Sequence, residues 1–513
     1  MKKTSFIKIN FFVIMSLPQL SPQLLENNQA LLPHYEQISK LPEKVLQFGT
    51  GVLLRGLPDY FIDKANRQGL FNGRIAIIKS TDRGGVDAFN QQQNLYTHVI
   101  RGIEDGQTVD ETLINSSVSR TLSASTQWYD ILQIAASPDL QVIISNTTEV
   151  GIQLIDDDIH ALPPVSFPAK LTALLYKRFQ TFGNNPEHGL VIIPTELLPD
   201  NGKILRDMVL EHAHRAHLGA NFQNWVERYN YFCSSLVDRI VPGKPSEDVR
   251  NSIFEERGYQ DDLIIMSEPY RLWAIEGNDH VKSVLSFAQV DEGVIIAPDI
   301  DIYRELKLRL LNGTHTLIVG LCYLYGKETV RESMTEPVLE EFTTQLMLDE
   351  LGPSIPYPVE KSQYTAFGNQ VLDRFRNPFI RHLLIDITVQ YTAKMRMRNI
   401  PTLLKHYETE QTPPTRFAIG FAAYLVFMKA VSERDGQFFG SHQGVAYPIR
   451  CDAAGYFYET WQKYGNDTDG LVKAVLSNVD LWEHDLTNLP GFEAQVAANV
   501  NDILKNGVAS LLA

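Results

Sequence analysis

Three polar side chains in an otherwise apolar stretch have the types and the spacing that proton transfer requires. Lys307, Asn312 and His315 precede the apolar segment TLIVGLCYLY. On an α-helix, Asn312 would lie about 140° and His315 about 80° round from Lys307, so one broad face could carry all three. A lysine among apolar neighbours can have a lowered pKa and carry a proton near neutrality. The alternative is a snorkelling lysine with a buried Asn and His bonded to the backbone.

Gly313 lies inside the same predicted helix. A glycine there costs about 1 kcal/mol relative to alanine, which indicates that another part of the chain approaches its backbone.

The composition is that of a globular protein with two or three domains. The chain has 513 residues, of which 44% are hydrophobic and 21% charged, and its net charge is −15. This charge argues against nonspecific binding to nucleic acid, and the absence of an apolar run of about 18 residues argues against a membrane span. Cys233, Cys322 and Cys451 lie far apart, which suits a reducing compartment and offers no metal-ligand spacing. We therefore expect a cytoplasmic protein.

A strand, a glycine turn and a helix open the part of the chain that we expect to bind a dinucleotide. The strand covers residues 44–48, and the amphipathic helix follows the glycines. Backbone N–H groups in such a unit face a pyrophosphate. The third glycine of G-x-G-x-x-G is missing, because Leu54 holds its place and Gly56 follows two residues later, so a plain turn remains an alternative. The predicted cofactor contacts here are Phe48, Gly49, Thr50, Gly51, Val52 and Arg55.

A second strand, residues 74–79, is followed by Asp82. An acidic residue at this place binds the adenosine ribose and selects NAD. The flanking Lys79 and Arg83 could instead accept a 2′-phosphate. We predict NAD as the cofactor and leave NADP open.

A third strand, residues 140–145, ends in Asn146, Thr147 and Glu149. A crevice at the switch point of a parallel sheet presents small polar groups of this kind, so we expect these three to contact the cofactor. The alternative is a helix cap, since Asn or Thr followed by Glu also forms a capping box.

Apolar strands and helices alternate over residues 40–298, and further strands are expected at 189–194, 236–242, 263–266 and 293–298. This alternation predicts an α/β, Rossmann-type domain with a mainly parallel sheet covered on both faces. Residues 1–39 are expected to form an N-terminal extension, in which Met15 offers a second start, so that 1–14 would carry little structural weight. From 299 to 513 helical periodicity dominates, which predicts a mostly helical domain.

A group of basic residues interrupts the acidic chain between 374 and 398, where only Asp386 opposes six cations. Arginine forks suit a carboxylate, so an anionic substrate is one interpretation, and a solvated helix face is the other. The expected substrate contacts are Arg374, Arg381, His382 and Lys394.

The spacing K-x4-N-x2-H at Lys307, Asn312 and His315 resembles the signature of the long-chain mannitol dehydrogenase family, the polyol-specific oxidoreductases. Further similar segments are GTGVLLRG, NTTEVG, VDRIVP, KLRLLNGTHT and RFRNP. The resemblance implies a Rossmann-type domain, a helical domain and metal-independent hydride exchange with a nicotinamide cofactor. One departure is Leu197, which stands where mannitol-type members have an asparagine that helps to bind the reacting oxygen.

Within the family, the segments ISNTTEVGI, PTELLPDNG, EPYRLWAIEG and WEHDLTNLPGF are similar to the hexuronate-specific branch. This similarity implies NAD-dependent reduction of D-tagaturonate to D-altronate in hexuronate breakdown. Reduction of D-fructuronate and a mannitol-type polyol reaction are the alternatives, and a nicotinamide-binding redox sensor is a remote one. A small sugar acid is the expected partner, with no nucleic acid and no membrane, as a monomer or a dimer.

Carbonyl reduction needs a proton donor and a group that polarises the carbonyl. No ligand set suggests a metal, so side chains should do both. Lys307 is the expected general acid and base, with an effect of about 10²–10⁴-fold. Asn312 would donate a hydrogen bond to the developing alkoxide, typically worth about 3 kcal/mol. His315 would bind a substrate hydroxyl or orient the other two.

Overall fold

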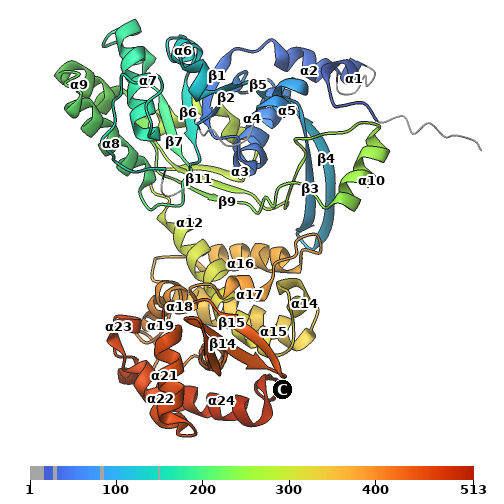
Figure 1. The fold of residues 1–513 in the computed structure, drawn as a ribbon, viewed down its shortest axis with the longest axis vertical. Helices are drawn as coiled ribbons and strands as arrows, with labels where there is room; N and C mark the ends of the chain where they lie inside the picture. The colour runs from blue at the N-terminus through green and yellow to red at the C-terminus, as the bar shows by residue number, and fades with distance from the viewer. Residues whose placement is uncertain (1–16, 27–31, 81–85, 148–150, 513) are drawn as a thin grey trace, which may run out of the picture.

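The protein is described by a computed structural model that covers residues 17–26, 32–80, 86–147 and 151–512. Two lobes lie one above the other, and helix α12 (Asp301–Leu306) leads from the N-terminal lobe into the helical C-terminal lobe (Figure 1). In the described part of the chain, no helix combines the length and the apolar character that crossing a membrane requires.

Six parallel strands form the central sheet of the N-terminal lobe, in the order β5-β2-β1-β6-β7-β8. They are β1 (Glu43–Phe48), β2 (Arg74–Lys79), β5 (Val118–Ser123), β6 (Val142–Ser145), β7 (Val191–Pro194) and β8 (Tyr231–Phe232). This is the doubly wound order of dinucleotide-binding folds, in which the ligand crevice lies where the strand order reverses, here between β1 and β6. The predicted Rossmann-type fold is confirmed.

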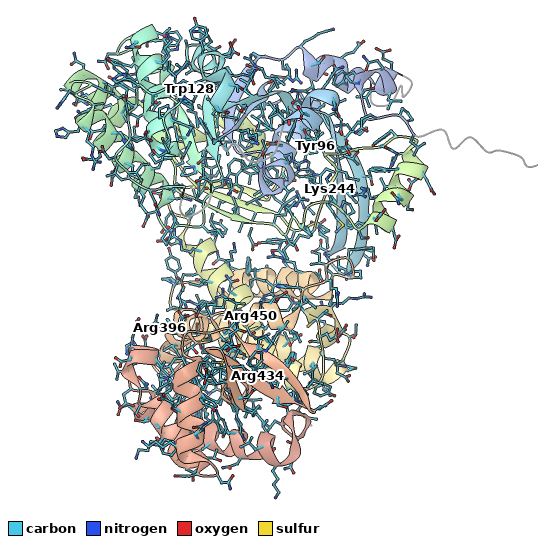
Figure 2. All side chains as sticks on the ribbon, in the orientation of Figure 1. Tyr96, Trp128, Lys244, Arg396, Arg434 and Arg450 are labelled. Carbon is cyan, nitrogen blue, oxygen red and sulfur yellow. The ribbon has the colours of Figure 1, made fainter. Side chains whose placement is uncertain are left out.

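Both faces of this sheet are buried, because apolar residues occupy successive strand positions. Val45 and Ile77 contribute to the core on one face, and Leu46 and Ile78 to the core on the other. Trp128, labelled in Figure 2, packs into the second core from a covering helix. The helices of this lobe are α1 (Pro22–Glu26), α2 (Leu32–Ser39), α3 (Val52–Gly56), α4 (Pro58–Arg67), α5 (Asp87–Gln91), α6 (Ala124–Ala135), α7 (Phe167–Phe182), α8 (Asn201–Arg215), α9 (Ala220–Tyr229), α10 (Glu247–Arg257) and α11 (Asp279–Val284).

Two small sheets complete the N-terminal lobe. One contains β10 (Ile265–Ser267), β3 (Tyr96–Glu104) and β4 (Gln107–Asn115), and the other contains β12 (Val294–Ala297), β11 (Leu272–Glu276) and β9 (Ser235–Asp238). The expectation that the strands near 236, 263 and 293 extend the parallel sheet is wrong. Their apolar character correctly identifies them as strands, but none of them pairs with a strand of the central sheet. β10 pairs with β3, β12 pairs with β11, and β9 pairs with β11 in the antiparallel direction.

The N-terminal extension is partly described. Leu20 and Leu25 are buried and pack with Leu95 and Tyr259 of the N-terminal lobe. The expectation for residues 1–14 lies outside the described residues.

The C-terminal lobe is built around the apolar helices α13 (Thr314–Leu324) and α20 (Thr415–Phe427), which belong to one large core. The other helices are α14 (Val330–Met334), α15 (Pro337–Gln345), α16 (Lys361–Arg376), α17 (Leu384–Ile387), α18 (Tyr391–Arg398), α19 (Ile400–His406), α21 (Ala454–Tyr464), α22 (Thr468–Leu476), α23 (Val479–Trp482) and α24 (Phe492–Asn506).

A three-stranded antiparallel sheet interrupts these helices, although strands were not expected after residue 299. It consists of β13 (Ser432–Arg434), β14 (Gln437–His442) and β15 (Val445–Ile449). Its two tight turns, Asp435-Gly436 and Gln443-Gly444, have positive φ at both residues, which is the hairpin geometry that such pairs favour.

Candidate active site

The stretch expected to form an α-helix at Lys307 is a π-helix, η3 (Lys307–Gly313), inserted between α12 and α13. Residues five apart lie about 140° from each other on an α-helix, and the i→i+5 hydrogen bonding of a π-helix brings them closer to the same side. Lys307 and Asn312 are five apart. Both side chains line one pocket of about 280 Å³.

This pocket lies at the seam between the two lobes. The N-terminal lobe contributes Glu196, Leu197, Leu198, Pro199, Ser235, Leu236 and Val237, and the C-terminal lobe contributes Arg304, Lys307, Leu308, Asn312 and Met397. Leu197 is 64% exposed, so the position that holds an asparagine in mannitol-type members supplies an apolar wall here.

The Lys307 ammonium is held by polar groups of β9, not by the apolar neighbours that the sequence suggested. Its Nζ donates to the Val237 carbonyl at 2.9 Å and lies 3.8 Å from Oδ1 of Asp238. Burial alone would raise the pKa of Asp238, but the charges of Arg374 and Lys307 hold that pKa below its ordinary value. Asp238 is therefore an ionised partner that fixes the amine at the pocket wall.

The backbone beside Asn312 is fixed by the C-terminal lobe. The Asn312 carbonyl accepts from Oγ1 of Thr316 at 2.8 Å and from Nη1 of Arg398 at 3.4 Å. Nδ2 of Asn399 donates to the Gly313 carbonyl at 3.0 Å and would lie 3.2 Å from a Cβ at that position. Gly313 thus allows the close approach that its place in the helix indicated.

His315 lies beside the Lys307 pocket instead of within it. The residue is 8% exposed, and its ring stacks on Phe375 at 4.1 Å and lines a neighbouring cavity of about 20 Å³ with His382 and Arg374. Burial and the nearby His382 and Arg374 lower the pKa of His315 well below its ordinary value. The imidazole is therefore neutral, and its Nε2 has no hydrogen-bond partner among the described residues. The structure brings together two of the three expected catalytic residues and places the third next to them.

The basic group around 374–398 is dispersed in space. Arg374 is buried and bonds Asp238 through both terminal nitrogens, at 2.9 and 3.0 Å. It also contacts Glu268 at 2.9 Å and lies over the Tyr270 ring at 4.3 Å. Both neighbouring carboxylates come from the N-terminal lobe, so Arg374 joins the lobes. This argues against the substrate-binding role expected of Arg374.

The other three expected substrate contacts, Arg381, His382 and Lys394, lie in different surroundings. Arg381 is 75% exposed and lies 3.9 Å from Glu328. Nζ of Lys394 donates to the Ile387 carbonyl at 2.9 Å, and His382 lies edge-on to His315 at 5.2 Å. His382 and Lys394 both lower the pKa of His315, and so does Arg374, which lines the same small cavity as His315 and His382.

A second pocket, of about 620 Å³, lies at the carboxyl ends of β1 and β6, where the strand order reverses. It is lined by six of the predicted cofactor contacts, which are Phe48, Gly49, Thr50, Gly51, Asn146 and Thr147. Gly49 has φ of +133°, and a Cβ there would lie 3.2 Å from the Asn146 carbonyl oxygen. The strand order, the glycine turn and the pocket together fit a dinucleotide.

Replacing Gly49 with alanine is expected to lower both the melting temperature and the affinity for the cofactor. The side chain would meet Leu54 at 3.0 Å in a backbone conformation that costs of order 1–3 kcal/mol for residues other than glycine. Gly51→Ala is the matched variant for stability, because φ is −63° and no heavy atom lies within 4 Å of its Cβ. Thermal unfolding and cofactor titration test this, and equal melting temperatures for the two variants would contradict it.

Two of the predicted cofactor contacts do not line this pocket. Arg55 is buried beneath β3, where its Nη1 donates to the Leu263 carbonyl and its guanidinium lies 5.3 Å from the Tyr96 ring. Val52 packs with the apolar core on the same side of the sheet. Tyr96, labelled in Figure 2, lies well inside the N-terminal lobe. Asp82 and Glu149 lie outside the described residues.

Sequence reasoning missed other residues that line the nucleotide pocket, because they precede or begin α7 instead of following a strand. These include Gln153, Ile155, Val165, Ser166, Phe167 and Lys170. The Ser166 side chain caps α7 by accepting from the Ala169 amide, and this serine two residues before a proline was the available signal.

Glu196 connects the two pockets. Its Oε1 accepts from the backbone amide of Thr147 at 2.8 Å, and its Oε2 accepts from Oγ of Ser145 at 3.2 Å. Burial raises the pKa of Glu196. The carboxyl therefore fixes the end of β6 at the nucleotide pocket while it also lines the Lys307 pocket. Within the described ranges, no three His, Cys, Asp or Glu residues cluster as a metal site would require.

Comparison with known proteins places this arrangement in a family. The mannitol dehydrogenase Rossmann domain matches residues 43–288, and the mannitol dehydrogenase C-terminal domain matches residues 299–504. The chain is 39% identical to altronate oxidoreductase of Halalkalibacterium halodurans over 479 residues, which cover 92% of each chain. It is 36% identical to altronate oxidoreductase of Bacillus subtilis, with 93% of this chain and 96% of the relative covered.

Two solved structures share the fold. The ternary complex of Pseudomonas fluorescens mannitol 2-dehydrogenase with NAD and D-mannitol has a TM-score of 0.63 at 23% identity and covers 93% of this chain and 94% of that chain. Substrate-free D-sorbitol dehydrogenase has a TM-score of 0.74 at 18% identity, covering 93% and 96%. The resemblance inferred from the sequence is thereby confirmed, and the chain belongs to the mannitol dehydrogenase family of oxidoreductases.

Proposed function

We propose that this oxidoreductase reduces D-tagaturonate to D-altronate, reversibly, with NAD(H). The observation that carries the proposal is the single pocket at the lobe seam that holds both Lys307 and Asn312, with Glu196 linking it to the nucleotide pocket. The substrate assignment is supported by the similarity to altronate oxidoreductases over more than nine-tenths of the chain.

A nicotinamide bound in the nucleotide pocket would supply the hydride, and Gly49, Thr50, Gly51, Asn146 and Thr147 would hold its dinucleotide. Lys307 would donate a proton to the carbonyl oxygen during reduction and accept one from the alcohol during oxidation. Val237 and Asp238 hold the amine in place through its other contacts. The Asn312 amide would donate to the same oxygen as it gains negative charge.

His315 would act as a neutral hydrogen-bonding group beside the Lys307 pocket, where it would orient Lys307 and Asn312 or bind a substrate hydroxyl. Its lowered pKa makes it unsuitable as the proton donor for the ketone, and its unpartnered Nε2 gives it a free position for one hydrogen bond. His382 and Lys394 would lie beside His315, and neither lines the pocket that contains Lys307.

NAD is the proposed cofactor. Lys79, the last residue of β2, and Ser80, which follows it, line the nucleotide pocket at the place where a free ribose hydroxyl and a 2′-phosphate would be distinguished. Comparing kcat/KM for NADH with that for NADPH tests this choice directly.

Initial rates with D-tagaturonate, D-fructuronate and D-fructose, each with NADH and with NADPH, test the proposal. The highest kcat/KM is expected for D-tagaturonate with NADH. A higher value for D-fructuronate would assign the alternative hexuronate, and equal values for D-fructose and D-tagaturonate would refute a sugar-acid substrate. Cofactor binding without turnover of any of the three would favour a redox sensor.

A further inference from the structure

The Lys307 pocket contains a second basic side chain, Arg304, which has no part in the proton transfer proposed above. Arg304 lines this pocket together with Lys307, and these two are the only basic side chains among the described residues that line it. Arg304 lies three positions before Lys307 on the helical rod, so their side chains leave neighbouring positions on one face, with Cβ atoms about 5–6 Å apart.

The ion pair that Arg304 already forms is weak enough for its guanidinium to bind another carboxylate. Its Nη1 forms an ion pair with Asp301, one turn earlier on α12. The two side chains are 29% and 49% exposed. Exposed helical pairs of this kind contribute little to stability, so a substrate carboxylate that enters the pocket can compete with Asp301 for the guanidinium.

The cations that the sequence suggested for this role are engaged elsewhere or lie away from this pocket. Arg374 is bound on Asp238 and Glu268, Arg381 is three-quarters exposed, and Lys394 donates to a backbone carbonyl. Arg398 is held at the carbonyl of Asn312 and at Thr316. None of these four lines the pocket that contains Lys307.

We propose that Arg304 binds the carboxylate of the sugar acid and so determines the preference for acids over neutral sugars. The inference rests on the proposed function, because it requires a sugar-acid substrate. A planar guanidinium can form two parallel hydrogen bonds with a carboxylate, which a lysine at the same place cannot. With the carbonyl oxygen at Lys307 and Asn312, the acid end of the substrate lies along α12 at Arg304.

The experiment compares kcat/KM for D-tagaturonate and D-fructose in the full-length enzyme. Arg304→Gln is expected to lower kcat/KM for D-tagaturonate by about 10–100-fold, the effect of losing hydrogen bonds to a charged group, and to change the value for D-fructose by less than about threefold. Arg304→Lys should fall between Arg304→Gln and the wild type. Asp301→Asn removes the competing carboxylate and should lower KM for D-tagaturonate.

Arg215→Gln is the matched control, since Arg215 forms a half-exposed helical ion pair with Glu211 on α8, outside both pockets. It should leave both substrates unaffected. Equal losses for both substrates in Arg304→Gln, or a retained preference for the acid, would overturn the role of Arg304. A wild-type enzyme without preference for D-tagaturonate would refute the proposed function itself and the inference with it.

Discussion

Replacing Lys307 with alanine is expected to lower kcat by about 10²–10⁴-fold, because the reaction loses its positioned proton donor and acceptor. The amine is fixed by the Val237 carbonyl and the Asp238 carboxylate, and it shares a pocket with Asn312. The nucleotide pocket does not include Lys307, so cofactor affinity should change little. Steady-state rates with D-tagaturonate and a cofactor titration measure the two quantities.

Two further variants sharpen this test. A small primary amine added to Lys307→Ala should restore part of the lost kcat, since it can occupy the space of the missing ammonium. Lys203→Ala is the matched control, because Lys203 is 54% exposed and pairs with Asp200 on the surface. An unchanged kcat in Lys307→Ala would remove Lys307 from the mechanism.

Replacing Arg374 with alanine is expected to destabilise the protein by about 3–5 kcal/mol, because two buried carboxylates would lose their cation. Arg374 is 3% exposed and binds Asp238 and Glu268, which lie on the opposite lobe. The variant should also lower activity, because Asp238 holds Lys307. Urea unfolding measures the free energy of unfolding, and a decrease of less than about 1 kcal/mol in Arg374→Ala would contradict the role of Arg374 in joining the two lobes.

Arg376→Ala is the control for Arg374→Ala on the same helix. Arg376 pairs with Glu340 at 2.7 Å, and both side chains are about a third exposed. Solvent screening reduces the contribution of such an ion pair to stability to about 0–1 kcal/mol, so the free energy of unfolding should hardly change in Arg376→Ala.

The cost of Arg374→Ala should depend on pH. The pKa of Asp238 is lowered in the folded protein, so this carboxyl contributes stability that is present above its ordinary pKa and is lost as the pH falls through the lowered value. Burial raises the pKa of Glu268, so its contribution has the opposite sign and is lost as the pH rises through the raised value. At acid pH both carboxyls are protonated and carry no charge for Arg374 to neutralise, so unfolding there should show a smaller difference between wild type and Arg374→Ala.

Local sequence was sufficient for the central features of the nucleotide-binding lobe. The strand at Arg74–Lys79 and the turn at Gly49–Gly51 were predicted, because an apolar strand followed by a glycine turn has few alternative conformations. The turns Asp105-Gly106 and Asp435-Gly436 are Asp-Gly pairs with positive φ at both residues, the sequence signature of a tight β-hairpin. The hairpins β3–β4 and β13–β14 are therefore also encoded in the local sequence.

The pairing of strands and the pairing of charged side chains could not be predicted from local sequence. Apolar patterning marks β9, β10 and β12 as strands, but it does not show that they leave the parallel sheet for two smaller ones. The basic residues 374–398 are close in sequence, yet Arg374 points into the seam and Arg396, at the edge of the lower lobe in Figure 2, pairs with Glu483. A cluster of basic residues in the sequence does not show which carboxylates pair with each of them in the folded protein.

The sequence by itself determined the family and the Rossmann-type fold, and it predicted Lys307 and Asn312 as a pair that could act on a carbonyl. Residue types and spacing are enough for these, because they depend on local patterns. Only the tertiary structure decided how the pair is aligned, since the π-helix at Lys307–Gly313 replaces the predicted α-helix, on which Asn312 would lie about 140° round from Lys307. It also placed Arg374 on a carboxylate of the opposite lobe and Arg304 in the pocket that contains Lys307, because ion pairs form between groups that folding brings together from distant parts of the chain.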